Sequence, residues 1–220
     1  MSFAEKFTDA NRRSELSRSL LSSSGAECEM PSVPGLFTEA FHADLADLSD
    51  TILNLSHITP FRFRFIDCVY YVKHGMFRLV ETESPLDDMK YSAISYVWKA
   101  LQPPSSDIES FQVAGSLDGD PIGLQTLKQA CLMSLRRGAS VLWLDRVSVM
   151  QTNKQDKAWQ IRRMHDIYKG CQCCIVLLDG LQRLPVLEEH KDSNWLQRSW
   201  TLQEVVVPMR TACLFASKFG

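Results

Sequence analysis

A short, nearly uninterrupted apolar run reads Tyr91-Ser-Ala-Ile-Ser-Tyr-Val-Trp98. Such a run is typical of a strand that is covered on both faces, as the strands of parallel sheets are. Similar runs follow at Ser140–Leu144 and Cys174–Leu178, and residues with helical periodicity separate the three runs, at Leu124–Arg137 and from Lys157 to Tyr168. This alternation predicts an α/β fold in which a parallel sheet carries helices on both faces. In the second helix Ile161, Met164 and Tyr168 share one stripe, which is expected to lie in the core.

Residues 1–34 are polar and rich in serine. Such a segment cannot bury enough apolar surface to offset the entropy lost on ordering, so we predict a disordered tail. From Phe37 to about Leu55 apolar residues recur at helical spacing, which predicts an amphipathic helix. We expect the segment 35–90 to pack on the core formed by residues 91–220.

A β-hairpin is predicted after Pro60, because Phe and Arg alternate there with a period of two and Lys73-His74-Gly75 supplies a turn. The second strand of this hairpin is expected at Met76 to Val80. Arg62 and Arg64 would then lie on its solvated face. A short strand is also expected at Phe111 to Ala114, within an otherwise loop-like segment.

The composition is that of a globular chain with one sizeable core, since 45% of its 220 residues are hydrophobic and 23% are charged. The net charge of -2 and the absence of a basic run exclude nucleic acid and anionic membranes as expected partners. The sequence has no secretory segment and no apolar run of about 18 residues. We therefore predict a cytoplasmic protein without a membrane segment.

The seven cysteines form no regular framework, and an odd number in an intracellular chain is expected to be reduced. The cluster Cys171-Gln-Cys-Cys174 lacks a second pair of ligands at zinc spacing and leads directly into a predicted strand. We interpret these thiols as small buried hydrophobic groups at the start of that strand. Neither a metal nor a cofactor is predicted.

Polar and aromatic side chains follow the first two strands of the predicted sheet. Ligands of open α/β sheets bind beyond the carboxyl ends of the strands. This rule selects Tyr96 and Trp98 after the first strand, and Asp145, Arg146 and Gln151 after the second. Asp145 and Gln151 keep two interpretations, because a carboxylate or an amide at such a place can fix a loop or contact a ligand.

The segment Arg198-Ser-Trp-Thr-Leu-Gln-Glu204 places an acid four residues after a tryptophan. On a helix, Trp200 and Glu204 share one face, so the carboxylate would lie beside an aromatic ring. An ion pair between Arg198 and Glu204, with Trp200 in the core, is one interpretation. A ligand site is the other, and it is favoured because three strand ends and this helix converge on one predicted rim.

Four blocks of the chain, taken together, resemble the heterokaryon incompatibility (HET) domain of filamentous fungi. They appear in the family's order over roughly residues 91–207, and the hairpin extends the resemblance to about Pro60. Departures from the family's pattern are Lys99, Ser148 and Met150; Ser148 stands where a cysteine is expected and argues against a cysteine nucleophile. The blocks are Tyr91–Trp98, Leu142–Gln151, Gln160–Tyr168 and Arg198–Glu204.

HET domains are distantly similar to the TIR domain, which has a flavodoxin-like fold, so the resemblance implies a flavodoxin/TIR-like sheet. Ser199-Trp200 with Glu204 is similar to the TIR pattern of serine, tryptophan and catalytic glutamate. By this resemblance Glu204 is the catalytic residue of an NAD nucleosidase, and NAD or a related nucleotide is the substrate. The substrate-binding candidates are Tyr96, Trp98, Asp145, Arg146, Gln151, Arg198 and Trp200.

The resemblance implies an effector of fungal innate immunity, which triggers programmed cell death on non-self recognition, self-associates and responds to an unidentified recognition partner. A non-enzymatic, self-associating adaptor is the alternative, in which Trp200 and Glu204 are structural. A Glu204→Gln substitution separates the two. The chain ends on the apolar residues Ala216–Gly220, which suggest another strand and a fragment of a longer protein.

Overall fold

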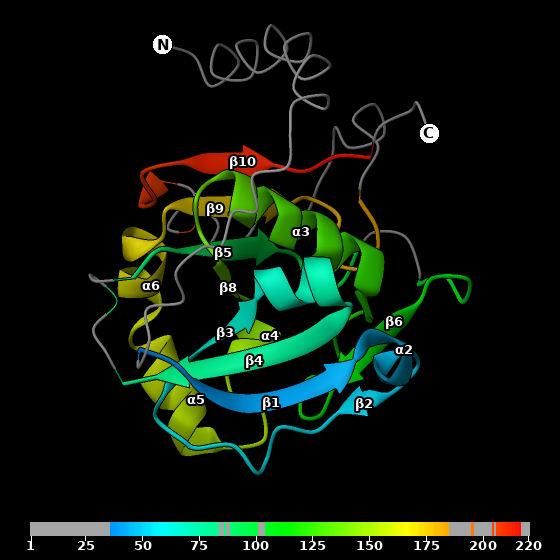
Figure 1. Ribbon diagram of the computed structural model, residues 1–220, viewed down its shortest axis with the longest axis horizontal. Coiled ribbons are helices and arrows are strands. Elements are labelled where there is room, and N and C mark those ends of the chain that lie inside the picture. Colours follow the sequence, from blue (N-terminus) through cyan, green and yellow to red (C-terminus); the bar gives the residue numbers. More distant parts are fainter. Residues whose placement is uncertain are drawn as a thin grey trace, which may run out of the picture. The chain divides into compact units, whose positions relative to one another are not determined.

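A seven-stranded mixed sheet forms the centre of the fold, with the strand order β1-β4-β3-β8-β5-β9-β10 (Figure 1). The structure is a computed structural model that describes residues 36–83, 86, 89–100, 104–184, 195, 204 and 206–216. All of these residues belong to the unit Val33–Gly220. The predicted tail and the predicted strand at the end of the chain, from residue 217, lie outside the described residues.

Four parallel strands form one part of the sheet: β5 (Tyr91–Tyr96), β8 (Val141–Trp143), β9 (Cys173–Leu177) and β10 (Thr211–Cys213). The first of them, β5, lies between β8 and β9, and β10 pairs with β9. If the four strands are numbered in chain order, their order across the sheet is 2-1-3-4. This is the strand order of a flavodoxin-like sheet. The predicted α/β fold and its three core strands are confirmed.

Three antiparallel strands continue the sheet beyond β8: β3 (Phe63–Asp67), β4 (Met76–Thr82) and β1 (Thr38–Asp44). The pair β3 and β4 is the predicted hairpin, although a π-helical turn, η2 (Tyr70–His74), precedes the turn at Gly75. Gly75 has a φ of 66°, a left-handed conformation that glycine adopts without strain. The hairpin is thus hydrogen-bonded to the parallel strands through β3.

The predicted helix from Phe37 to Leu55 is wrong. This segment forms β1, the four-residue helix α2 (Leu45–Leu48) and the short strand β2 (Ile52–Leu53). Without β1, the outer edge of β4 would present unpaired backbone groups, and pairing with β1 satisfies them. Tertiary hydrogen bonding therefore outweighs the helical spacing of the apolar residues. β2 belongs to a second, three-stranded sheet with β6 (Ser110–Val113), predicted at Phe111 to Ala114, and β7 (Ile122–Gly123).

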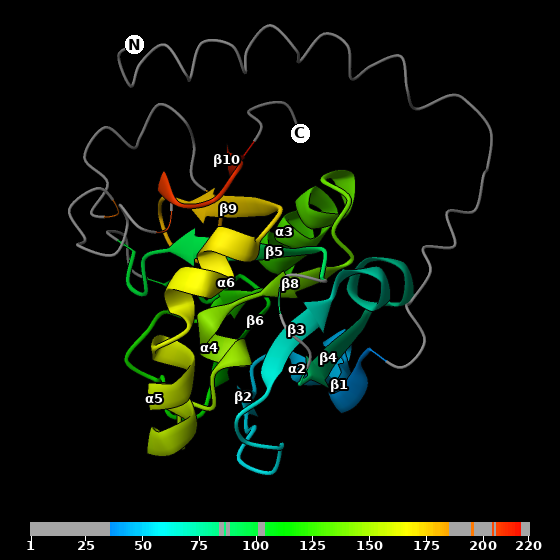
Figure 2. The ribbon, with the colours of Figure 1, turned by 90° about the vertical axis from the view of Figure 1, so that its left-hand side faces the viewer.

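Helices cover both faces of the parallel strands, as predicted. The helix α3 (Leu124–Arg136) packs Leu127 and Ala130 into one core, and α6 (Met164–Gly170) packs Ile167 and Tyr168 into the other. Figure 2 shows α3 on one side of the sheet and α5 and α6 on the other. None of the helices in the described ranges combines the length and apolar character that crossing a bilayer requires.

The helix predicted from Lys157 to Tyr168 is instead two helices, α5 (Lys154–Ile161) and α6, separated at residues 162–163. The break ends the continuous apolar stripe that the spacing of Ile161, Met164 and Tyr168 predicts. Ile161 is 44% exposed, whereas Tyr168 is buried. The predicted core position of Ile161 is therefore wrong.

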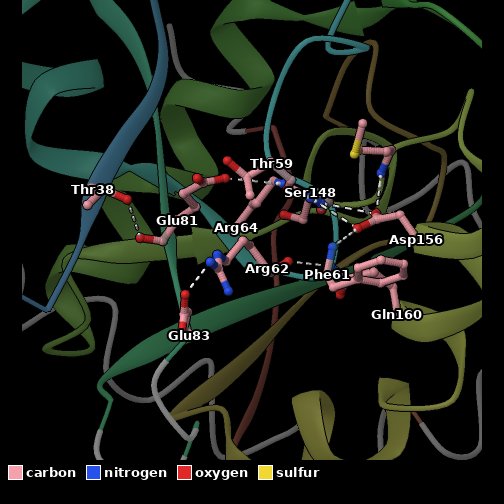
Figure 3. Close-up of polar contacts among 11 residues, drawn as sticks. Thr38, Thr59, Phe61, Arg62, Arg64, Glu81, Glu83, Ser148, Asp156 and Gln160 are labelled. Atoms are coloured by element: carbon pink, nitrogen blue, oxygen red, sulfur yellow. Dashed lines mark hydrogen bonds and ion pairs between the residues drawn. The ribbon is translucent and has the colours of Figure 1, made fainter.

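Arg64 is fully buried, which corrects its predicted place on a solvated strand face. Figure 3 shows its polar contacts. Its guanidinium lies 3.0 Å from Asp156 Oδ1 and 3.1 Å from Oδ2, and it also donates to the carbonyl oxygens of Ser148 and Thr59. Asp156 lies in the first turn of α5, so this ion pair joins β3 to that helix. Arg62, two residues earlier, pairs with the exposed Glu83 as expected of a solvated face.

The thiols of Cys171, Cys173 and Cys174 are buried at the start of β9, as predicted from the apolar run that follows them. Burial raises the pKa of Cys171 to about 12 and raises the pKa of Cys174 well above its ordinary value. Burial likewise raises the pKa of Cys131 in α3. These thiols remain protonated in the folded protein at pH values that ionise a thiol in the unfolded chain.

We expect the free energy of unfolding to fall as the pH rises above about 8.5, the ordinary thiol pKa. There the unfolded chain releases thiol protons that the folded protein retains, so each buried thiol lowers the stability by up to about 1.4 kcal/mol per pH unit. Urea unfolding between pH 7 and 10 measures this slope, and a Cys171→Ala variant should give a shallower one. Equal slopes for the two proteins would contradict the assignment.

Candidate functional site

Two carboxylates lie at the carboxyl end of β5, the central strand of the parallel group. Successive side chains of a strand point to opposite faces, so Ser95 and Tyr96 diverge there. Tyr96 belongs to the core that α3 covers, and Trp195, which contacts Ser95, belongs to the core that α6 covers. The predicted rim is thus made of two clusters, one centred on Asp145 and one on Glu204.

The Asp145 cluster joins the ends of β5 and β8. Asp145 is the first residue of α4 (Asp145–Ser148). Its Oδ1 accepts hydrogen bonds from the Tyr96 hydroxyl and the Arg146 backbone N–H, both at 2.6 Å, and its Oδ2 accepts one from Trp98 Nε1 at 3.0 Å. One carboxylate therefore fixes both aromatic rings that follow β5. Burial, and then the charge of Asp145, raise the pKa of Tyr96 well above its ordinary value, which keeps the phenol a hydrogen-bond donor.

Arg146 is fully buried beneath Trp98, with its guanidinium carbon 5.7 Å from the ring centroid. The guanidinium donates to the hydroxyl of Ser116 at 3.2 Å, to the carbonyl of Ser116 at 3.1 Å and to the carbonyl of Asp120. Asp120 in turn receives a hydrogen bond from the backbone of Ala100. Arg146 therefore holds the loop that packs behind Trp98.

Gln151 lies in the polar turn after α4, and its amide nitrogen donates to the carbonyl of Asp145 at 3.0 Å. Its amide oxygen is buried and makes no hydrogen bond within the described part of the chain. Gln151 thus braces the Asp145 backbone and presents one acceptor next to it. Both interpretations of this residue, loop anchor and ligand contact, are compatible with that placement.

The Glu204 cluster lies on the other face of β5. Glu204 is only 4% exposed, and its Oε2 accepts a hydrogen bond of 2.5 Å from the Ser95 hydroxyl. The indole N–H of Trp195 donates to the same hydroxyl at 2.8 Å. The predicted neighbours Arg198 and Trp200 lie outside the described residues, so the ion pair and the ring predicted for Glu204 remain predictions.

Tyr168 lies near both carboxylates. Its hydroxyl donates to the carbonyl of Ile94 at 2.9 Å. Burial, then the charge of Glu204 and, with a smaller effect, that of Asp145 raise its pKa well above the ordinary value. Tyr168 is therefore a neutral group that interacts electrostatically with two acids. Sequence reasoning placed Tyr168 in the core and did not connect it to the site.

Ser95 and Trp195 are site residues that the sequence-based prediction missed. A serine in the middle of a buried apolar strand is a signal, because buried hydroxyl groups require hydrogen-bond partners. Trp195 offers no comparable signal, since its partner is 100 residues away in the chain. Within the described ranges, no group of three or more His, Cys, Asp and Glu residues could hold a metal ion.

The part of the chain that begins with β5 has a recognisable family signature. Residues 91–185 match the family model of the heterokaryon incompatibility protein (HET). This HET match confirms the predicted family over the first three of the four blocks and implies a role in heterokaryon incompatibility. No curated protein and no solved structure matches the chain. The HET match includes the Asp145 cluster and ends before Arg198, Trp200 and Glu204.

Proposed function

We propose that this HET protein acts in the fungal non-self response that ends in programmed cell death, and that it does so by cleaving NAD between nicotinamide and ribose. One observation carries the proposal: the buried carboxylate of Glu204 is oriented by Ser95 at the carboxyl end of β5. That strand end adjoins β9, where the direction of winding reverses. Flavodoxin-like sheets bind nucleotides at this switch point.

The reaction breaks the bond between the ribose C1′ and the nicotinamide nitrogen, whose electron pair leaves with neutral nicotinamide. The ribose becomes an oxocarbenium-like cation, and water adds to it with loss of a proton to give ADP-ribose. An ionised Glu204 beside the ribose stabilises this cation and accepts hydrogen bonds from the sugar hydroxyls. In this proposal the carboxylate acts on the developing charge, and no redox step is needed.

The Asp145 cluster supplies the aromatic surface for this substrate. Trp98 is only half-buried, and its ring is held by Asp145 on one edge and by Arg146 beneath it. A ring fixed in this way stacks on a nucleotide base at little cost in side-chain entropy. Gln151, a further proposed substrate contact, supports the backbone of Asp145 next to this surface. Arg198 and Trp200 complete the proposed substrate contacts.

Incubation of the purified protein with NAD tests the proposal. We expect release of nicotinamide and ADP-ribose in equal amounts, followed by chromatography, and a faster release when the protein is clustered through a fused oligomerisation tag. The tag alone with NAD is the control. A protein that releases no nicotinamide at high concentration, clustered or not, contradicts the proposed reaction.

A non-enzymatic, self-associating adaptor is a second candidate, and a surface cluster favours it. Phe61 is 42% exposed, and its ring lies against Trp159, which also contacts Phe63. The guanidinium of Arg163 also lies over Trp159, 4.0 Å from the ring centroid. Exposed aromatic and arginine side chains are enriched at protein interfaces. In that case the cell-death signal would pass through assembly and not through Glu204.

A further inference from the structure

Hydrogen bonds connect three buried polar side chains, those of Trp195, Ser95 and Glu204. The exposed fractions are 5% for Trp195, 1% for Ser95 and 4% for Glu204. Trp195 Nε1 lies 2.8 Å from Ser95 Oγ, and Ser95 Oγ lies 2.5 Å from Glu204 Oε2. The three side chains come from the end of β5, from the connection after β9 and from residue 204, so segments far apart in the sequence meet at this point.

The chemistry of the three groups gives these hydrogen bonds one direction. An indole N–H only donates, so it occupies an acceptor position of the Ser95 hydroxyl. The single proton of that hydroxyl is then directed at the carboxylate. An O–H···O⁻ distance of 2.5 Å belongs to the strong, charge-assisted class. A hydrogen bond donated to a carboxylate favours its ionised form and opposes the effect of burial.

Two described neighbours of Glu204, Tyr168 and Cys174, remain neutral near neutral pH. Tyr168 of α6 and Cys174 of β9 both feel the charge of Glu204, and burial raises the pKa of each above its ordinary value. Asp145 of α4 acts on the same tyrosine from the other face of β5. Tyr168 and Cys174 therefore stay neutral below about pH 8, a range that includes the ordinary titration of a carboxylate.

We propose that Ser95 and Trp195 are positioning residues that keep the Glu204 carboxylate oriented and ionised inside its buried site. The catalytic meaning of this arrangement rests on the proposed function, but the arrangement itself does not. Ser95 fixes one oxygen of the carboxylate, and Trp195 fixes the orientation of Ser95. The connection after β9 is thereby tied to the central strand at the carboxylate.

The test is the titration of Glu204 in uniformly ¹³C-labelled protein, followed by the NMR shift of its side-chain carboxyl carbon and assigned with a Glu204→Gln variant. In Ser95→Ala the midpoint is expected to rise by about one pH unit, since one charge-assisted hydrogen bond is lost. Trp195→Phe removes only the outer donor and should raise it by roughly half as much. Ser92→Ala is the matched control, because Ser92 is a buried serine of the same strand whose hydroxyl bonds Ser134.

An unchanged midpoint in Ser95→Ala, or an equal rise in Ser92→Ala, overturns the proposal. If Ser95→Ala does not fold, the Trp195→Phe titration carries the test, and an unchanged midpoint there overturns it. The measurement needs no NAD, so a raised midpoint in a protein that releases no nicotinamide supports the positioning role and contradicts the proposed function alone. In an active protein, the acid limb of the pH profile of kcat should move upward with the midpoint.

Discussion

A Glu204→Gln variant is expected to release nicotinamide from NAD at least about 100-fold more slowly than the unaltered protein, because the neutral amide cannot balance the positive charge that develops on the ribose. The substitution keeps the size of the side chain and an oxygen that can accept from Ser95. We therefore expect the thermal unfolding and the assembly state to change little. Nicotinamide release under clustered conditions is the measurement.

An Asp166→Asn variant is the matched control, because it removes an exposed carboxylate from α6, the helix that carries Tyr168. It should retain full activity. Expression of both variants in fungal cells then separates the two candidate functions. Lost toxicity of Glu204→Gln with unchanged fold and assembly supports an enzyme, whereas retained toxicity supports the adaptor and contradicts a catalytic role for Glu204.

Asp156→Ala is expected to lower the free energy of unfolding by about 3–5 kcal/mol, because it removes the carboxylate that contacts the fully buried Arg64 charge most closely and leaves only Glu81, 3.7 Å away. The substitution also removes the acceptor for two backbone N–H groups, those of Phe61 at 2.6 Å and Met150 at 3.1 Å. These bonds fix the chain before β3 and the turn that carries Gln151. Urea unfolding at pH 7 measures the loss.

The neighbouring surface pair provides the control for this experiment. Glu83→Ala removes the ion-pair partner of Arg62, which lies two residues before Arg64. This pair is at the surface, since Glu83 is exposed and Arg62 is half-buried. Exposed pairs contribute about 0–1 kcal/mol, so this variant should unfold close to the unaltered protein. An Asp156→Ala protein no less stable than Glu83→Ala would show that the buried pair does not hold β3 against α5. Asp156→Asn, which keeps one acceptor oxygen, should lie between them.

The sequence predicts the parallel part of this fold well, because strands buried on both faces leave an unambiguous apolar run. β5, β8, β9 and α3 all lie where their patterns predict. The segment that forms β1 is different, since its partly exposed residues satisfy a helical spacing equally well. Its conformation depends on the open edge of β4, and β4 is remote in the chain. The burial of Arg64 escapes prediction for the same reason, because it depends on Asp156, which is 92 residues away in the chain.

The candidate site also has one part that the sequence predicts and one part that it does not. The strand-end rule brings Tyr96, Trp98 and Asp145 to one place without knowledge of any contact, and their hydrogen bonds join them there. The rule cannot tell which face of β5 a neighbouring group occupies. In the structure Glu204 contacts Ser95 and not Tyr96; the two residues are adjacent on β5 and point to opposite faces. The contribution of Trp195 depends on the path of a long connection, which local periodicity does not specify.

The stretch that the HET family model matches lacks the strands that pair with both of its outer strands. β8 is hydrogen-bonded on its outer side by β3, which precedes residue 91, and β9 by β10, which follows residue 185. A polypeptide cut to residues 91–185 would expose both strand edges to solvent, and open edges of apolar strands pair with other chains and aggregate. Each edge of the recognised stretch is protected by sequence that the family model does not cover.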